Sequence, residues 1–153
     1  MGISSVIQNS AKADLLRAGT NFNTAAGTPA GHAFKIALYT DSTTIDTTTT
    51  AYGGPSNEVS GTGYSSGGNA LTNTGVGTTT VTSFTDFSDT SWTSASFTAR
   101  GWLIYNTTAI TGLTANRAVC SITFGGDKTV SSGTFTIQFP TNDSSSAIIR
   151  LTS

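Results

Sequence analysis

Short stretches of alternating apolar and polar residues recur along this chain, and residues that favour turns separate them. In the clearest stretch, residues 134–139, three large apolar side chains alternate with Thr and Gln. A period of two is the pattern of a strand that buries one face. We expect further strands at residues 33–39, 70–72, 79–87, 97–105, 117–124 and 147–151. Several short strands joined by turns predict an all-β, antiparallel β-sandwich or jelly-roll-like fold.

The N-terminal segment has a helical pattern instead. Ser5 and Gln8 have the spacing of a capping box, apolar residues recur at helical spacing through residues 3–18, and Gly19 can end the helix. We expect one amphipathic helix over about residues 4–18, packed on its own β domain or on a neighbouring subunit. The expected plan is an N-terminal helix in residues 1–19, a connector in 20–32 and a β-sandwich in 33–153, which together form one globular domain.

The composition argues against two classes of partner. Charged residues make up 10% of the chain, against about a quarter in typical soluble domains, while one residue in three is Ser or Thr. The net charge is −1 with only seven Lys and Arg, and each phosphate contact to nucleic acid needs a basic side chain. No segment reaches the roughly 20 apolar residues of a membrane helix, and no signal peptide is evident. We expect no nucleic-acid or membrane partner.

Few residues could support catalysis or hold a metal. The chain has one histidine, His32, in the connector, which we expect to be an exposed loop residue. Its one cysteine, Cys120, lies in an apolar stretch and is expected in the core. The aspartates at 41, 46, 86 and 89 suit turn capping, with an irregular calcium site as the alternative. We expect no catalytic, metal-binding or cofactor-binding residues, and so no enzyme.

A glycine-rich passage, residues 61–68, superficially resembles a phosphate-binding loop. It lacks the Gly-Lys-Ser/Thr ending and does not lead into a helical pattern. We therefore expect its glycines to form turns or bulges with positive φ before the strand near residue 71.

Two segments are candidates for contact with another protein. Residues 41–56 contain four consecutive threonines, Thr47, Thr48, Thr49 and Thr50, and few apolar anchors, so we expect a long surface loop that becomes ordered against a partner. The run from Trp102 to Tyr105 is apolar on both faces. Either the N-terminal helix covers the second face, or a subunit contact does. In the second case Arg100, Trp102 and Ile104 are the candidate contact residues.

The order of several motifs over residues 33–152 resembles a family of small virion structural proteins of tailed bacteriophages. The motifs are Phe34-Lys35-Ile36-Ala37-Leu38-Tyr39, Asn57-Glu58-Val59-Ser60-Gly61-Thr62-Gly63-Tyr64 with Gly67-Gly68, Trp92 to Arg100, Phe124-Gly125-Gly126-Asp127-Lys128, Gly133 to Phe139, and Ile148 to Leu151. The combination is more specific than any one motif. The family brings no catalytic residues with it.

The resemblance implies a capsid cement or decoration protein. Such a protein binds the outside of the phage head and stabilises contacts between subunits of the major capsid protein, as a homo-oligomer made in the host cytoplasm. One alternative is a head-fibre or tail-tip module that binds a host glycan or receptor; another is a tail or connector protein. Exposure of Trp92 or Tyr64 beside Asp89 or Asn57 would favour glycan recognition, and burial of the rings would favour cement.

Overall fold

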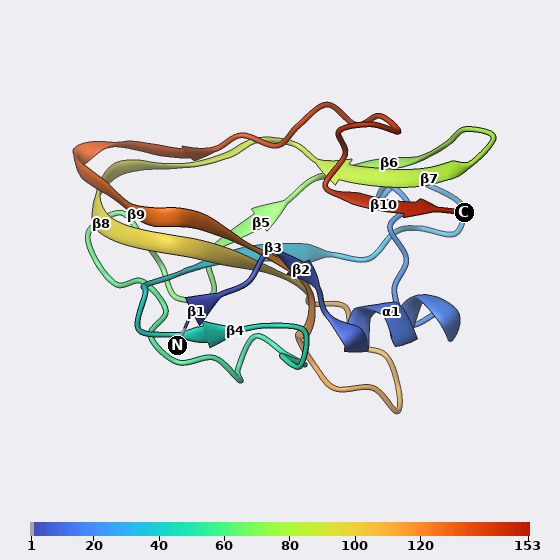
Figure 1. The fold of residues 1–153 in the computed structure, drawn as a ribbon, viewed down its shortest axis with the longest axis horizontal. Coiled ribbons are helices and arrows are strands. Elements are labelled where there is room, and N and C mark those ends of the chain that lie inside the picture. Colours follow the sequence, from blue (N-terminus) through green and yellow to red (C-terminus); the bar gives the residue numbers. More distant parts are fainter. Residues whose placement is uncertain (1) are drawn as a thin grey trace.

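The computed structural model describes residues 2–153 and has an all-β sandwich fold with one short helix (Figure 1). The predicted fold class is confirmed. The elements are β1 (Gly2–Ile3), β2 (Val6–Ile7), α1 (Asn9–Leu16), β3 (Phe34–Tyr39), β4 (Thr44–Ile45), β5 (Asn69–Leu71), β6 (Asn73–Thr78), β7 (Thr82–Phe87), β8 (Thr90–Asn106), β9 (Arg117–Ile137) and β10 (Ile149–Thr152).

The strands form three sheets. The largest has five strands in the order β2-β9-β8-β3-β5, and all its pairs are antiparallel. A second sheet has the order β10-β7-β6, and β1 pairs with β4 in parallel. The three-stranded sheet and α1 lie at the same end of the molecule, the sheet above and the helix below in Figure 1. That arrangement positions the cleft described below.

The hairpin of β8 and β9 is much longer than the strands expected from the sequence, and it bends. The expected strand at 117–124 and the first four residues of the one expected at 134–139 are parts of the same strand, β9. Register shifts follow Trp92, Ala95 and Ala99, and Ser94 and Ser132 have positive φ. Bulges of this kind bend a strand and let it pass from one sheet to another. Figure 1 shows the hairpin doubling back, so that its two halves lie in different layers.

The main core fills the space between these layers. Its buried side chains come from both halves of the hairpin and from the strands around them: Ile36, Leu38, Trp92, Phe97, Trp102, Ile104, Ile137 and Ile149. At the bend the Phe97 and Phe135 rings lie 5.2 Å apart, and the Trp92 and Phe97 rings 6.4 Å apart in an edge-on arrangement. Such pairs add to the stabilisation from burial alone.

A second, smaller core covers the opposite face of the five-stranded sheet. Leu103 and Tyr105 of β8 pack there with Ile3 of β1 and Ile45 of β4. Both faces of the Trp102–Tyr105 run are thus covered within the chain. The covering elements are the β1-β4 pair and the segment around Tyr52, rather than the N-terminal helix, because residues 2–7 form strands that pair with β4 and β9.

The helix is shorter than the expected range of 4–18. It begins at Asn9, and its N-cap residue, Gln8, makes no side-chain cap bond, so the predicted capping box does not form. Its inward side carries a buried carboxylate, Asp14, whose Oδ2 lies 2.7 Å from Nε of the buried Arg117. Leu16 is 93% exposed. A polar pair, rather than a continuous apolar stripe, therefore joins α1 to β9.

Candidate functional site: an apolar cleft at one end of the sandwich

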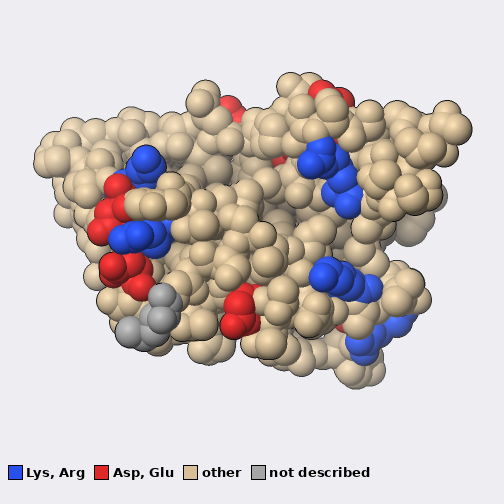
Figure 2. Space-filling view, in the orientation of Figure 1, with Lys and Arg blue, Asp and Glu red and all other residues tan. Residues whose placement is uncertain are grey.

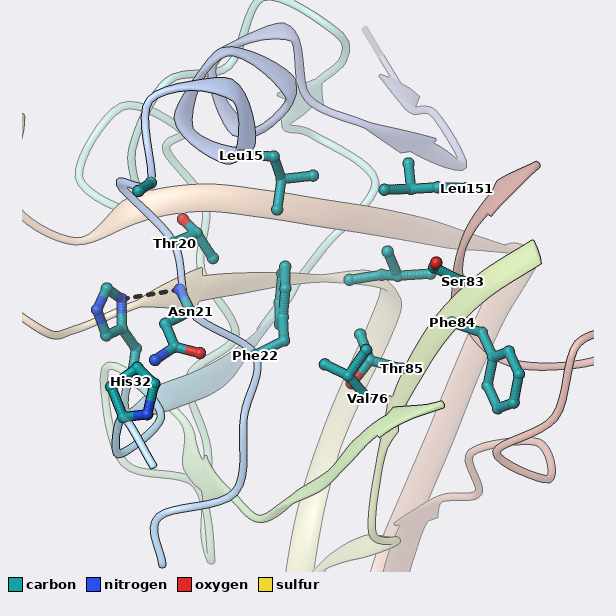
Figure 3. A pocket seen from close by; sticks show the side chains of 13 residues that line it. Leu15, Thr20, Asn21, Phe22, His32, Val76, Ser83, Phe84, Thr85 and Leu151 are labelled. Atoms are coloured by element: carbon teal, nitrogen blue, oxygen red, sulfur yellow. Dashed lines mark hydrogen bonds between the residues drawn. The ribbon is translucent and has the colours of Figure 1, made fainter. Parts of the chain in front are cut away.

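A cleft with a volume of about 500 Å³ opens between the three-stranded sheet and the segment that contains α1 (Figure 3). Its lining residues come from three parts of the sequence: Leu15, Ala18, Thr20, Asn21, Phe22, Pro29 and His32; Val76, Ser83, Phe84 and Thr85; and Ile149 and Leu151. Small-molecule sites usually have volumes between about 300 and 1,000 Å³.

Strand register explains one wall of the cleft. Thr85 of β7 is paired with Val76 of β6 on one side and with Ile149 of β10 on the other, and Ser83 is paired with Leu151. Paired residues in neighbouring strands point to the same face of a sheet. At Ile149 this face of the sheet packs against the sandwich core. Further along β10, at Leu151, the same face lines the cleft.

The opposite wall is formed by Leu15 of α1 and by Phe22 of the connector. In Figure 3 the side chains of Leu15, Phe22, Leu151 and Val76 point into the same space. The Phe22 ring stacks on Phe34 of β3 at 5.0 Å, which ties this wall to the main core. The floor is therefore continuous with the packed interior.

The mouth of the cleft is apolar and open to solvent. Val76 is 56% exposed and Leu151 is 53% exposed, whereas Phe22, Thr85 and Ile149 deeper in the cleft are buried. Two further exposed hydrophobic residues do not line the cleft: Leu16, at the end of α1, and Val81, in the turn between β6 and β7. Exposed apolar surface that is contiguous often marks a binding site.

The connector beside the cleft is held by polar contacts that are partly or fully buried. Nδ1 of His32 accepts a hydrogen bond from the backbone N–H of Asn21 (3.3 Å) and lies 2.8 Å from Nδ2 of Asn106. Burial, and then the nearby Arg117 charge, lower the pKa of His32, which favours the neutral ring. Arg117 also donates to the carbonyl of Gly19 at 2.6 Å. His32 is therefore partly buried and bonded, not the exposed loop residue expected from the sequence.

A second constellation surrounds Glu58. Its Oε1 accepts hydrogen bonds from the Tyr64 hydroxyl and the Gly67 N–H, both at 2.7 Å, and its Oε2 accepts from Tyr52 (2.6 Å) and Ser66 (2.9 Å). The Tyr105 hydroxyl donates to the Gly67 carbonyl at 2.8 Å. With every acceptor position used inside the chain, this carboxylate serves to hold the loop in place.

The glycine-rich passage is the loop that Glu58 holds. Gly61, Gly63, Gly67 and Gly68 have positive φ, and the passage leads into β5, as expected. A Cβ at Gly68 would collide with the backbone carbonyl of Ile36. Glycine is therefore required by close approach to β3 as well as by its backbone angles.

The threonine-rich segment is ordered by its own chain. Thr43 and Ile45 are buried, β4 pairs with β1, and the Tyr52 ring stacks on Tyr105 at 4.6 Å. Within the threonine run, the N–H and hydroxyl of Thr48 both donate to the Asp46 carboxylate. The expectation of a loop that needs a partner to become ordered is thus corrected. Thr48 and Thr50 are exposed, and Thr47 and Thr49 are half-buried.

The three candidate contact residues on β8 differ in exposure. Trp102 is 3% exposed and Ile104 is fully buried, so their own chain already covers them. Arg100 remains accessible and lies 2.8 Å from Asp127 and 3.4 Å from Asp41. On the face of the molecule drawn in Figure 2, acidic and basic side chains form a group at the left end, and wide uncharged areas lie beside that group. Of the three, only Arg100 is placed to meet a partner.

The remaining titratable groups are dispersed. Cys120 is buried, as expected, and burial raises its pKa to about 12. Asp46 accepts from turn backbone, as expected, but Asp86 is a buried group whose carboxylate accepts from the N–H groups of Phe87 and Ile148. Within residues 2–153 there is no cluster of three or more His, Cys, Asp or Glu side chains. No helix in that range is long and apolar enough to cross a membrane.

Neither the cleft nor the Glu58 cluster was predicted from the sequence. The cleft unites residues more than 60 positions apart, and no periodic pattern links them. The composition held a signal for the cluster, because the chain has one glutamate and four tyrosines, and all four tyrosines lie around that glutamate: Tyr39, Tyr52, Tyr64 and Tyr105. Comparisons with protein-family models, with curated proteins and with solved structures find no match.

Proposed function

We propose that this protein is a non-enzymatic structural component of a phage virion, a cement or decoration protein that binds the outside of the head and stabilises contacts between major capsid subunits. The proposal rests on the motif resemblance described above and on one structural observation. The outer face of the β8–β9 hairpin presents hydroxyl groups, while its aromatic residues face inward.

The hydroxyl groups on this face are arranged in cross-strand pairs. The hydroxyl oxygens of Ser91 and Thr136 lie 2.8 Å apart, and those of Thr98 and Thr129 lie 2.7 Å apart. Trp92 and Phe135, next to the first pair, point into the core. An outer face of this kind suits a polar interface made of many hydrogen bonds, each of about 0.5–1.5 kcal/mol net. Repetition of weak contacts over a particle would supply avidity.

The same burial disfavours the glycan-binding alternative. The Trp92 ring is buried, and the Tyr64 hydroxyl both donates to Glu58 and accepts the N–H of Leu38. Sugar sites usually offer accessible aromatic faces beside polar groups. The Trp92 ring is closed to a sugar, and the half-buried Tyr64 ring stacks on Trp92 with its hydroxyl already bonded, so cement is the better supported of the two.

Co-sedimentation with undecorated heads of the phage that encodes the chain would test the proposal. We expect saturation at a fixed ratio close to the number of major capsid subunits. Thr136→Glu places a charge on the hydroxyl face and should weaken binding, whereas Thr111→Glu, on the exposed loop between β8 and β9, should not. No binding, or only a few copies per particle, would overturn the cement proposal in favour of the tail or fibre alternatives.

A further inference from the structure

The cleft at the end of the sandwich is built on parts of the fold that hold each other in place. One wall belongs to the hydrogen-bonded sheet β10-β7-β6. The other is tied to β9 through the Asp14–Arg117 ion pair and the bond from Arg117 to Gly19, and to β3 through the Phe22–Phe34 stack. Both walls are thus anchored independently of any occupant, so the cleft is preformed. Preformed, concave and mostly apolar sites are typical of small-ligand binding.

The electrostatics of the lining select against a charged occupant. None of the lining residues, all within the described residues 2–153, is Lys, Arg, Asp or Glu. The one titratable residue among them, His32, already has its Nδ1 in contact with the N–H of Asn21 and with the side chain of Asn106, and burial lowers its pKa, so its ring is neutral. Moving an ion into such surroundings without a partner is costly, so an uncharged ligand is favoured.

The depth of the cleft argues for a small molecule over a flat protein surface. Exposure falls from about half at Val76 and Leu151, at the mouth, to 4% at Ile149 and 3% at Thr85. A ligand that reached the floor would bury apolar surface on several sides, which favours binding in proportion to the area removed from water. The Ser83 hydroxyl, beside Leu151 in Figure 3, offers a polar contact near the mouth.

We propose that this cleft binds one uncharged small molecule with a hydrocarbon or aromatic body and few polar atoms, held between Leu15 and Phe22 on one side and Val76, Ile149 and Leu151 on the other. This binding does not depend on the role in the virion proposed above. It adds a ligand-binding activity to a chain for which the sequence predicts none.

A fluorescence titration with the neutral probe N-phenyl-1-naphthylamine, using the full chain, tests the proposal. The probe should show saturable enhancement with one site per chain. Leu151→Asp places a charge at the mouth and should weaken binding by about tenfold or more. Leu16→Asp is the matched control: the same change at a more exposed leucine that does not line the cleft, expected to leave affinity within about twofold.

Two additional measurements keep the result interpretable if Leu151→Asp unfolds the chain. Ser83→Trp fills the cleft without adding charge and should also weaken binding, with folding checked by circular dichroism. Dodecanol should displace the probe, and dodecanoate should do so at least about tenfold less well.

Several outcomes would overturn the proposal. These are absence of saturable enhancement, equal loss of binding in Leu16→Asp and Leu151→Asp, and better displacement by dodecanoate than by dodecanol. A stoichiometry of one probe per two chains, with a dimer seen by light scattering, would show instead that a second copy covers the cleft. Head binding measured on the same variants is a separate readout, so failure of either proposal would be recognised on its own.

Discussion

Glu58 accepts a 2.7 Å hydrogen bond from the hydroxyl of Tyr64, and that hydroxyl in turn accepts the backbone N–H of Leu38 in β3. The carboxylate thereby connects the glycine-rich loop to the central sheet. Replacing it leaves several partly buried donors without an acceptor, and each orphaned group costs about 1–3 kcal/mol. We expect Glu58→Ala to lower the free energy of unfolding by about 2–4 kcal/mol, and Glu58→Gln by less.

Urea denaturation would measure these losses. The control is Asp127→Asn, which removes the charge of an exposed carboxylate paired with Arg100. Its effect should stay within about 1 kcal/mol, as for surface ion pairs generally. Equal effects at the two positions would contradict a structural role for Glu58.

The buried ion pair should behave differently from an exposed one. Asp14→Leu or Arg117→Met alone removes one partner of the buried pair, which typically costs about 3–5 kcal/mol, and less in Arg117→Met because Arg17 still lies 3.5 Å from Asp14. The double variant Asp14→Leu/Arg117→Met should recover part of that loss, although the bond from Arg117 to Gly19 is also removed. A double-mutant cycle from thermal or urea melts gives the coupling energy. Simple additivity of the single effects would mean that the pair is not coupled.

Stability should fall as the solution is acidified from neutral pH. Burial and the Arg117 charge lower the pKa of His32 below its usual 6.5. The unfolded chain then binds the proton more readily than the folded chain. The contribution of neutral His32 to the free energy of unfolding is therefore complete above pH 6.5 and is lost as the pH falls below that value. Urea melts at about pH 7.5 and about pH 5 should show this loss in the wild type and a smaller one in His32→Asn.

Asp46 and Asp143 do not obscure that measurement, and Asp86, whose pKa is raised by burial, changes stability in the opposite direction on acidification and does so in the wild type and in His32→Asn alike. Hydrogen bonds from Thr48 lower the pKa of Asp46, and those from Ser145 and Ser146 lower the pKa of Asp143, both from 3.8. Their stabilisation is therefore complete above that pH and is lost only in more acidic solution. An unchanged loss in His32→Asn between neutral pH and about pH 5 would rule out His32 as its source.

Cys120 should be chemically inert in the folded chain. Its thiol is buried on β9, and burial raises its pKa to about 12, so the reactive thiolate is scarce at pH 8. We expect no reaction with Ellman's reagent until denaturant unfolds the chain, when one thiol per chain reacts. Fast labelling under native conditions would mean that β9 opens locally.

The glycine at position 68 should resist substitution. It has a φ of +66°, and an added Cβ would meet the carbonyl of Ile36. Gly68→Ala should therefore destabilise by more than about 2 kcal/mol, through strain and the shift of β3 or the loop. Gly53→Ala, where an added Cβ meets no atom within 4 Å, is the control for differential scanning calorimetry. Equal melting temperatures for the two variants would contradict the close approach.

The alternating stretches predicted the longer strands because a period of two in the sequence shows directly which side chains of a strand are buried. Residues 34–39 are a clear case, since they form β3 as expected. The N-terminal residues were mistaken for helix because β1 and β2 have only two residues each, too few to show a period. Their structure depends on β4 and β9, far away in the sequence. The cleft escaped prediction for the same reason, since only the packing of distant elements creates it.

The bent β8–β9 hairpin has a mechanical consequence. Because one pair of strands runs through both layers, the layers cannot slide over each other without breaking hydrogen bonds along the hairpin. The two layers should therefore resist shear as one body and lose their protection from hydrogen exchange in a single cooperative step. The open end, by contrast, holds the short strand β10 and the eight-residue helix, so fraying should begin there.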